Sequence, residues 1–198
     1  MLDKNNKIIK EQNVVYKDIK RNYDVFHVPI VQEQLRLRGI KCPKIENFTI
    51  RGLNDISYSY LYVNGVDRTR IDDGEYIQIV NDISKFIEDC NIQSLCNVTV
   101  YDKIDVFLDN LSIDETNALE KQMILSLEKM YGDIKKKYRC THLIHGDLDY
   151  SNIIWNDEGY TIIDFDECCL APKGMECAIA LARLIKKKLV ITRMYILR

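Results

Sequence analysis

The chain has 198 residues, which is enough to bury a hydrophobic core as one domain or as two small lobes. A hydrophobic content of 46%, a charged content of 29% and a net charge of -2 are typical of a globular protein and do not suggest a polyanionic partner. The seven cysteines have no paired spacing, which argues against a disulfide framework or a zinc site. We find no apolar signal segment at the N-terminus and no apolar stretch long enough for a membrane span, so we expect a cytoplasmic protein.

The first part of the chain is predicted to be rich in strands. A short strand is expected over residues 7–10 and a longer one over residues 13–20. Alternation places Val15, Lys17 and Ile19 on one face of the longer strand. Taken alone, a lysine on a strand is most often a solvated charge.

Helical and extended patterns then alternate. Residues 29–38 are predicted to form a helix, with proline near its start and Gly39 just past its end. A tyrosine-rich strand is expected over residues 56–63, ended by Asn64-Gly65. Apolar residues at helical spacing predict a long helix over residues 75–90.

A second long helix is predicted to begin at Ser112, with Glu115 completing a capping box. Its apolar residues share one face and are expected to point inward: Leu119, Met123, Ile124, Leu127 and Met130. Strands are expected to dominate residues 141–165, and residues 175–188 are predicted to form a last helix.

The order of these elements predicts an α+β protein with two lobes. Residues 1–64 would form a β-rich N-terminal lobe with one helix, and residues 65–198 a mainly helical C-terminal lobe. The two would meet near residues 63–65.

Two segments carry residues suited to phosphoryl transfer: His145-Gly146-Asp147-Leu148-Asp149-Tyr150-Ser151-Asn152 and Ile163-Asp164-Phe165-Asp166. This reaction needs a carboxylate near the attacking hydroxyl and oxygen ligands that hold Mg²⁺ on the nucleotide. Asp147 and Asn152 have the spacing of a kinase catalytic loop, with aspartate as base and asparagine as metal ligand.

A hairpin between the two segments would bring the metal ligands together. If the turn is centred on Glu158, Asn152 faces Asp164, and opposed side chains lie about 4.5–5.5 Å apart. Oxygen-bearing side chains at that distance suit Mg²⁺. Asp147 close to Asp164 would cost about 4 kcal/mol in charge repulsion at an effective dielectric near 20, which a bound cation would reverse.

The motif His-Gly-Asp-Leu-x-x-x-Asn-Ile-Ile, followed by Ile-Asp-Phe-Asp, resembles the signature of aminoglycoside phosphotransferases, choline/ethanolamine kinases and spore-coat kinase-like proteins. The resemblance implies a protein-kinase-like fold. It also implies that Asp147 is the catalytic base, that Asn152 and Asp164 are the magnesium ligands, and that His145 is a structural member of the loop.

The resemblance extends more loosely to the rest of the chain. The strand that carries Lys17 looks like the one whose lysine reaches the α- and β-phosphates of ATP, with Lys20 as the alternative lysine. Glu33 looks like the glutamate that pairs with this lysine. Residues 59–65 resemble the strand and hinge that hold adenine, and Glu176 stands where the family has an aspartate that braces the catalytic loop.

Compared with that family, the chain looks truncated at both ends. The residues before the lysine strand contain no glycine-rich loop, so the N-terminal lobe would be incomplete. One helix follows the metal-binding hairpin where the family has several, so the C-terminal lobe would be short. Residues 177–198 carry six basic residues and no acidic one, which fits a solvated helix end, with nucleic-acid or membrane binding as the weaker alternative.

The predicted function is a phosphotransferase that uses Mg²⁺ and ATP, or another nucleoside triphosphate. The acceptor would be a hydroxyl of a small molecule such as an aminoglycoside, a choline-like alcohol or a sugar, with no nucleic-acid or membrane partner. The alternative is a truncated or degenerate kinase-like protein without catalysis, which serves as a binding or structural module.

Overall fold

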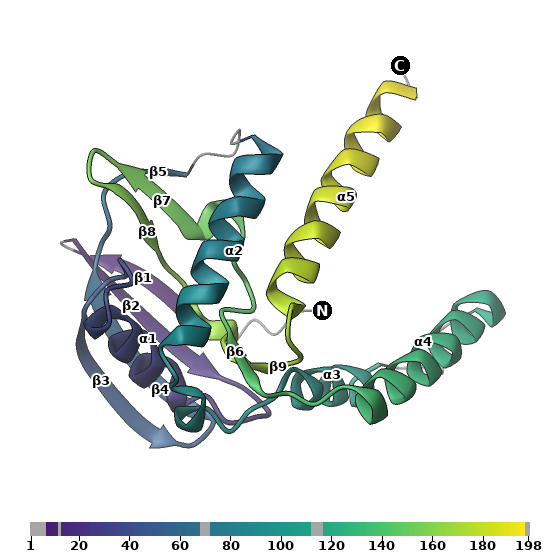
Figure 1. The fold of residues 1–198 in the computed structure, drawn as a ribbon. Helices are drawn as coiled ribbons and strands as arrows, with labels where there is room; N and C mark the ends of the chain where they lie inside the picture. The colour runs from purple at the N-terminus through teal and green to yellow at the C-terminus, as the bar shows by residue number, and fades with distance from the viewer. Residues whose placement is uncertain (1–6, 12, 68–71, 112–116, 197–198) are drawn as a thin grey trace.

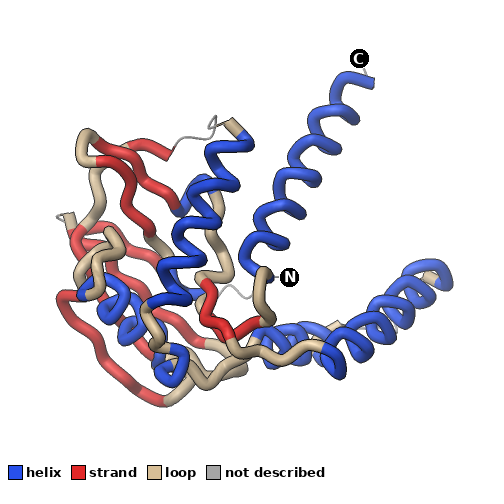
Figure 2. Tube along the Cα trace, in the orientation of Figure 1, coloured by secondary structure: helices blue, strands red, loops and turns tan. Residues whose placement is uncertain are grey.

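A computed structural model describes residues 7–11, 13–67, 72–111 and 117–196, and the side chains among residues 13–186 of these segments. The five helices of the described segments are α1 (His27–Leu37), α2 (Asp73–Asp89), α3 (Val100–Asp109), α4 (Ala118–Lys137) and α5 (Met175–Ile196). Strands gather on one side of the molecule, while α4 and α5 project away from it (Figures 1 and 2). The chain is thus a mixed α and β protein, as predicted.

A four-stranded antiparallel sheet forms the N-terminal part, in the order β1-β2-β4-β3. Its strands are β1 (Lys7–Glu11), β2 (Val14–Lys20), β3 (Ile45–Gly52) and β4 (Asp55–Leu61). The predicted face of β2 is confirmed, because Val15, Lys17 and Ile19 are all buried. Strand β3 was not expected from the sequence.

Two smaller sheets hold the segments that carry the kinase-like motifs. One contains β5 (Val66–Asp67), β7 (Ile153–Asn156) and β8 (Gly159–Ile162), and the other pairs β6 (His142–Ile144) with β9 (Cys169–Ala171). Strand β6 leads directly into the Asp147 loop, and β9 follows the Asp164 segment. Their antiparallel pairing therefore holds the two motifs side by side.

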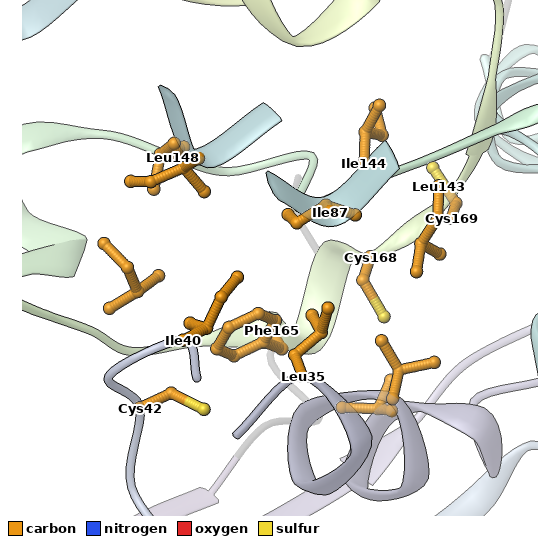
Figure 3. Close-up of a cluster of buried hydrophobic side chains, with 14 of the residues drawn as sticks. Leu35, Ile40, Cys42, Ile87, Leu143, Ile144, Leu148, Phe165, Cys168 and Cys169 are labelled. Carbon is orange, nitrogen blue, oxygen red and sulfur yellow. The ribbon is translucent and has the colours of Figure 1, made fainter. Parts of the chain in front are cut away.

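The hydrophobic core joins the N-terminal part to these motifs. Phe165, which follows Asp164, is 1% exposed and lies among Leu35 and Ile40 on one side and Ile87 and Leu148 on the other (Figure 3). These residues come from α1 and the residues just after it, from α2 and from the loop that carries Asp147. Burial of this phenylalanine thus fixes where the neighbouring aspartates lie.

Helix α4 begins later than expected. Its N-cap is Asn117, whose side chain accepts from the backbone of Glu120, while the Glu120 carboxylate accepts from the backbone N–H of Asn117. This reciprocal pair is a capping box. The box predicted at Ser112 and Glu115 lies outside the described residues.

The prediction that the apolar face of α4 points inward is wrong. No residue of α4 is buried, and Leu119, Met123, Leu127 and Met130 are 57–67% exposed. Periodicity shows that these residues share a face but not that another element covers it.

Helix α5 begins at Met175 as predicted, extends beyond residue 188, and packs against α2. No helix in the described part of the chain is both long enough and apolar enough to cross a membrane.

Candidate active site

The loop after β6 adopts a conformation that only glycine tolerates at Gly146. This residue has φ of 81°, and an added Cβ would lie 2.3 Å from the backbone oxygen of Glu167. The close approach brings the Asp147 loop against the segment that follows Asp164.

Glu176 braces this loop from the first turn of α5. Its Oε2 accepts from the backbone N–H groups of His145 and Gly146, at 2.6 Å and 3.1 Å. The glutamate is 2% exposed, so these charge-assisted hydrogen bonds are shielded from water. The brace expected at this position is therefore present, with glutamate in place of aspartate.

His145 is a structural member of the loop, as the resemblance implies. Its Nε2 donates to the carbonyl oxygen of Ile163 at 3.0 Å, and its Nδ1 accepts from the backbone N–H of Asp147 at 3.3 Å. Burial lowers the pKa of His145, which keeps the ring neutral, so that Nε2 can donate while Nδ1 accepts. The histidine thereby ties the Asp147 loop to the end of β8.

Asp147 and Asn152 lie together. The Nδ2 of Asn152 donates to the backbone oxygen of Asp147 at 2.8 Å and to its Oδ2 at 3.0 Å. The guanidinium of Arg183 on α5 forms an ion pair with Oδ1 of the same aspartate. Burial raises the pKa of Asp147, and the negative charge of Asp164 adds to this, while Arg183 and Asn152 oppose it.

The hairpin register predicted from the sequence is wrong by one residue. Strands β7 and β8 are joined by a two-residue turn, so that Asn156 pairs with Gly159. The side chain of Asn156 accepts from the backbone of the second turn residue at 3.0 Å, which favours the tighter turn. As a result Asn152 is bonded across the hairpin to Ile163, 3.0 Å between O and N, and does not stand opposite Asp164.

Asp164 has a left-handed backbone, with φ of 65° and ψ of 65°. This conformation is uncommon for residues other than glycine, and such outliers cluster at functional sites. Its Oδ1 accepts from Nζ of Lys17 at 2.6 Å, and its side chain remains 30% exposed. Burial raises the pKa of Asp164, but the Lys17 ammonium outweighs this effect and holds it below its usual value.

Lys17 is 3% exposed and faces Asp164 and Asp166, whereas the alternative Lys20 is exposed at the end of β2. The expected pairing of Lys17 with Glu33 is not formed. Both oxygens of Glu33 accept from Arg36 one turn along α1, at 2.6 Å and 2.9 Å. The local arginine satisfies this glutamate in place of Lys17.

Three residues of the site had no assigned role in the sequence analysis. Asp166 Oδ2 accepts from Lys17 at 2.8 Å, and its Oδ1 accepts from the hydroxyl of Tyr58 at 2.5 Å. Alternation along β4 would have placed Tyr58 on the face that meets Lys17, because the two are partners across the sheet. No local pattern marks Arg183.

The expected metal ligands, Asn152 and Asp164, form a small set of oxygen donors. The described residues contain no group of three histidine, cysteine or acidic side chains able to hold a metal ion. Mg²⁺ in kinases takes only one or two carboxylates together with nucleotide phosphates and water. Two groups meet that smaller requirement. Asp164 is partly open to solvent, and Asn152 offers its Oδ1 while its Nδ2 donates to Asp147.

Comparison with known proteins places this geometry among the kinase-like folds. The RIO domain profile matches residues 91–171, which is less than half of the chain. No curated protein matches the chain.

Three solved structures illustrate the likeness. The GDP and kanamycin complex of APH(2")-IIia has a TM-score of 0.56 at 17% identity and covers 86% of this chain and 66% of its own. Amicoumacin kinase hAmiN, with AMP-PNP and Ca²⁺, has a TM-score of 0.59 at 10% identity. The match covers 83% of this chain and 59% of the kinase. A choline/ethanolamine kinase family protein from Mesorhizobium loti has a TM-score of 0.51 at 9% identity. The match covers 85% of this chain and 57% of that protein.

The chain thus spans less than two thirds of the length of these structures. At such identities the likeness establishes the fold and not the activity. The chain has the protein-kinase-like fold that RIO domains share with aminoglycoside phosphotransferases and choline/ethanolamine kinases.

Proposed function

We propose that this chain carries the catalytic centre of a small-molecule kinase, which transfers the γ-phosphoryl group of ATP or another nucleoside triphosphate to a hydroxyl group. One observation carries the proposal: Lys17, the Asp147–Asn152 pair and Asp164 come from distant parts of the chain and converge. A cation, a base and oxygen ligands at one place are what phosphoryl transfer requires.

Asp147 would orient the acceptor hydroxyl and take its proton. Its Oδ2 accepts from Asn152, which fixes the carboxylate, and its side chain is 37% exposed, so that an acceptor could reach it. The proton would go to the carboxylate as the oxygen attacks the γ-phosphorus and the bond to the nucleoside diphosphate breaks.

Asp164 and Asn152 would hold Mg²⁺, and Lys17 would bind the nucleotide phosphates. When bound, the metal would neutralise charge on the phosphates. Asp164 would then exchange its contact with Lys17 for one with the metal, and the freed Lys17 donor would serve the phosphates. The brace from Glu176 keeps the Asp147 loop in place during this exchange.

The chemical class of the acceptor is proposed from the solved structures that share this fold. These include proteins solved with kanamycin and with amicoumacin, and a choline/ethanolamine kinase family protein. The proposed acceptors are accordingly hydroxyls of aminoglycosides, choline-like alcohols or sugars.

One observation favours a second candidate, a kinase-like protein without catalysis that serves as a binding or structural module. The two central carboxylates are already neutralised within the chain, Asp147 by Arg183 and Asp164 by Lys17. In that case the site would be a set of structural ion pairs.

A nucleotide titration distinguishes the two candidates. With the purified chain, we expect ATP to bind in the presence of Mg²⁺ and to bind at least tenfold more weakly when Asp164 is replaced by alanine. The exposed Asp157→Ala, in the turn of the same hairpin, serves as the matched control and should bind like the wild type. Equal affinity with and without Mg²⁺, or no binding at all, would contradict the kinase.

A further inference from the structure

Lys17 lies in a buried cluster formed by β2, β4 and the segment after β8. Its Nζ donates to Asp164 at 2.6 Å and to Asp166 at 2.8 Å, and the Tyr58 hydroxyl donates to the second oxygen of Asp166 at 2.5 Å. The side chains of Lys17 and Asp166 are only 3% and 7% exposed. The contact between Lys17 and Asp166 is therefore shielded from water, which strengthens its hydrogen bond.

The two carboxylates of this cluster differ in what they can do. Asp164 is 30% exposed and can turn one oxygen toward a bound metal nucleotide. Asp166 has both oxygens occupied, one by Lys17 and the other by Tyr58, and has almost no access to solvent. Asp164 is thus the solvent-accessible partner of the lysine, and Asp166 is the enclosed one.

Glu33 cannot act as that fixed partner while it bonds Arg36. Both of its oxygens accept from this arginine, and its side chain is 28% exposed on α1. In addition, Oε2 of Glu33 is 3.4 Å from the backbone nitrogen of Ile45. The glutamate is thus bound on the side of α1 that faces β3.

We propose that Asp166, held by Tyr58, is the positioning residue that keeps Lys17 aimed at the nucleotide phosphates, in the role that the resemblance gives to Glu33. This inference rests on the proposed function. When Asp164 turns to the metal, Lys17 loses one of its two partners, and Asp166 keeps its ammonium from swinging away.

The charge balance of the cluster agrees with this role. Burial lowers the pKa of Lys17, but the charges of Asp166 and Asp164 more than compensate and raise it above its ordinary value. The lysine is therefore fully charged at neutral pH, as a phosphate-binding cation must be.

The first test compares Mg-ATP affinities of three variants. We expect Asp166→Asn to weaken binding about tenfold or more, because a charge-assisted hydrogen bond to Lys17 is lost. Tyr58→Phe should weaken it less, about threefold, because only the orientation of Asp166 is loosened. The matched control Glu33→Gln should bind like the wild type.

The second test needs no nucleotide and reads the position of Lys17 directly. The rate of acylation of each lysine by an amine-reactive ester can be followed by peptide mass spectrometry. We expect Asp166→Asn to raise the rate at Lys17 at least severalfold, while Lys103, which is 13% exposed and bonded to the adjacent Glu167, keeps its rate. An increase at Lys103 as well would show that the substitution had loosened the whole segment after β8, and the Lys17 rate in Tyr58→Phe would then be the deciding measurement.

The outcomes separate the inference from the proposed function. If the wild type binds no nucleotide, the kinase proposal fails, and the acylation of Lys17 still decides whether Asp166 anchors it. The inference is overturned if Asp166→Asn leaves both the acylation rate and the affinity unchanged. It is also overturned if Glu33→Gln has the effects expected of Asp166→Asn.

Discussion

At the scale of single residues, Asp147 is subject to two opposing influences. Burial raises its pKa, while the guanidinium of Arg183 lowers it. A general base works only when it is deprotonated, so activity should fall as the pH drops through the pKa of this carboxyl. In the proposed kinase, Arg183 would thereby extend the active pH range toward acid.

Replacing Arg183 by methionine should shift the acid limb of the kcat/KM profile to higher pH. The sign follows because removal of a positive charge disfavours the ionised carboxylate of Asp147. The measurement is the pH dependence of phosphoryl transfer. Lys186→Met, an exposed site on the same helix, is the control and should leave the profile in place. An acid limb that does not move in Arg183→Met would contradict the role of the ion pair.

Lys17→Met should destabilise the fold by about 3–5 kcal/mol, because buried Asp166 and partly exposed Asp164 would lose their common cation. Urea unfolding at neutral pH measures the loss. Lys20→Met lies at the exposed end of the same strand and should change the free energy of unfolding by less than about 0.5 kcal/mol. Similar losses in both variants would show that the cluster contributes little to stability.

The motif spacing predicted that Asp147 and Asn152 belong to one kinase-like loop, and their side chains are hydrogen-bonded. Their roles as base and metal ligand stay predictions. The pairing of Lys17 with Glu33 failed, since a nearby arginine in the same helix competes for the glutamate. Such competition depends on side-chain geometry in three dimensions, which spacing does not report.

At the scale of elements, most strands and helices were predicted, but the residues that pair between strands were not. The hairpin of β7 and β8 was expected, yet a turn shorter by one residue changed which residues oppose each other. Register depends on turn geometry, and a single-residue shift moves every side chain of the pairing. The Asn156 side chain, which favours the shorter turn, is a signal that could have been used.

Helix α4 illustrates the same limit on a larger element. Its exposed apolar face predicts that truncation of these side chains costs little stability. We expect Met130→Ala to change the free energy of unfolding by less than about 0.5 kcal/mol, since Met130 is 60% exposed. Ile87→Ala, at a site 1% exposed on α2, should cost about 2–5 kcal/mol. A large loss in Met130→Ala would mean that another surface covers α4 in solution.

At the scale of the whole molecule, the core and the candidate site are one structure. Phe165 and Leu148 belong to the core, and each stands next to a residue of the proposed centre. The fold class could be predicted because the motifs are local in sequence. The orientation of α4 and α5 could not, because it depends on which surfaces meet.

Two buried histidines should make stability depend on pH. Burial lowers the pKa of His27 and of His145, so the folded state resists a proton that the unfolded state accepts. Their stabilisation is complete above the pKa of the unfolded state, near 6.5. It is lost as the pH falls from there through the lower pKa of the folded state, at up to about 1.4 kcal/mol per pH unit for each histidine. Asp147 and buried Asp166, whose pKa values are raised, act in the opposite direction.

The contribution of one histidine can be isolated by difference. Unfolding by urea from pH 7.5 to 5.0 should show a stronger loss toward acid in the wild type than in His27→Gln, because the glutamine cannot titrate. Parallel pH profiles for the two proteins would contradict a depressed pKa for His27.

The most direct test of the kinase proposal is phosphoryl transfer itself. The chain would be incubated with Mg-ATP and a panel of aminoglycosides, choline-like alcohols and sugars, and phosphorylated product would be measured. We expect turnover with at least one acceptor class, a loss of about 10²–10⁴-fold in Asp147→Asn, and unchanged Mg-ATP affinity in that variant. Turnover that survives in Asp147→Asn, or a wild-type chain that binds Mg-ATP and phosphorylates none of these acceptors, would contradict the account.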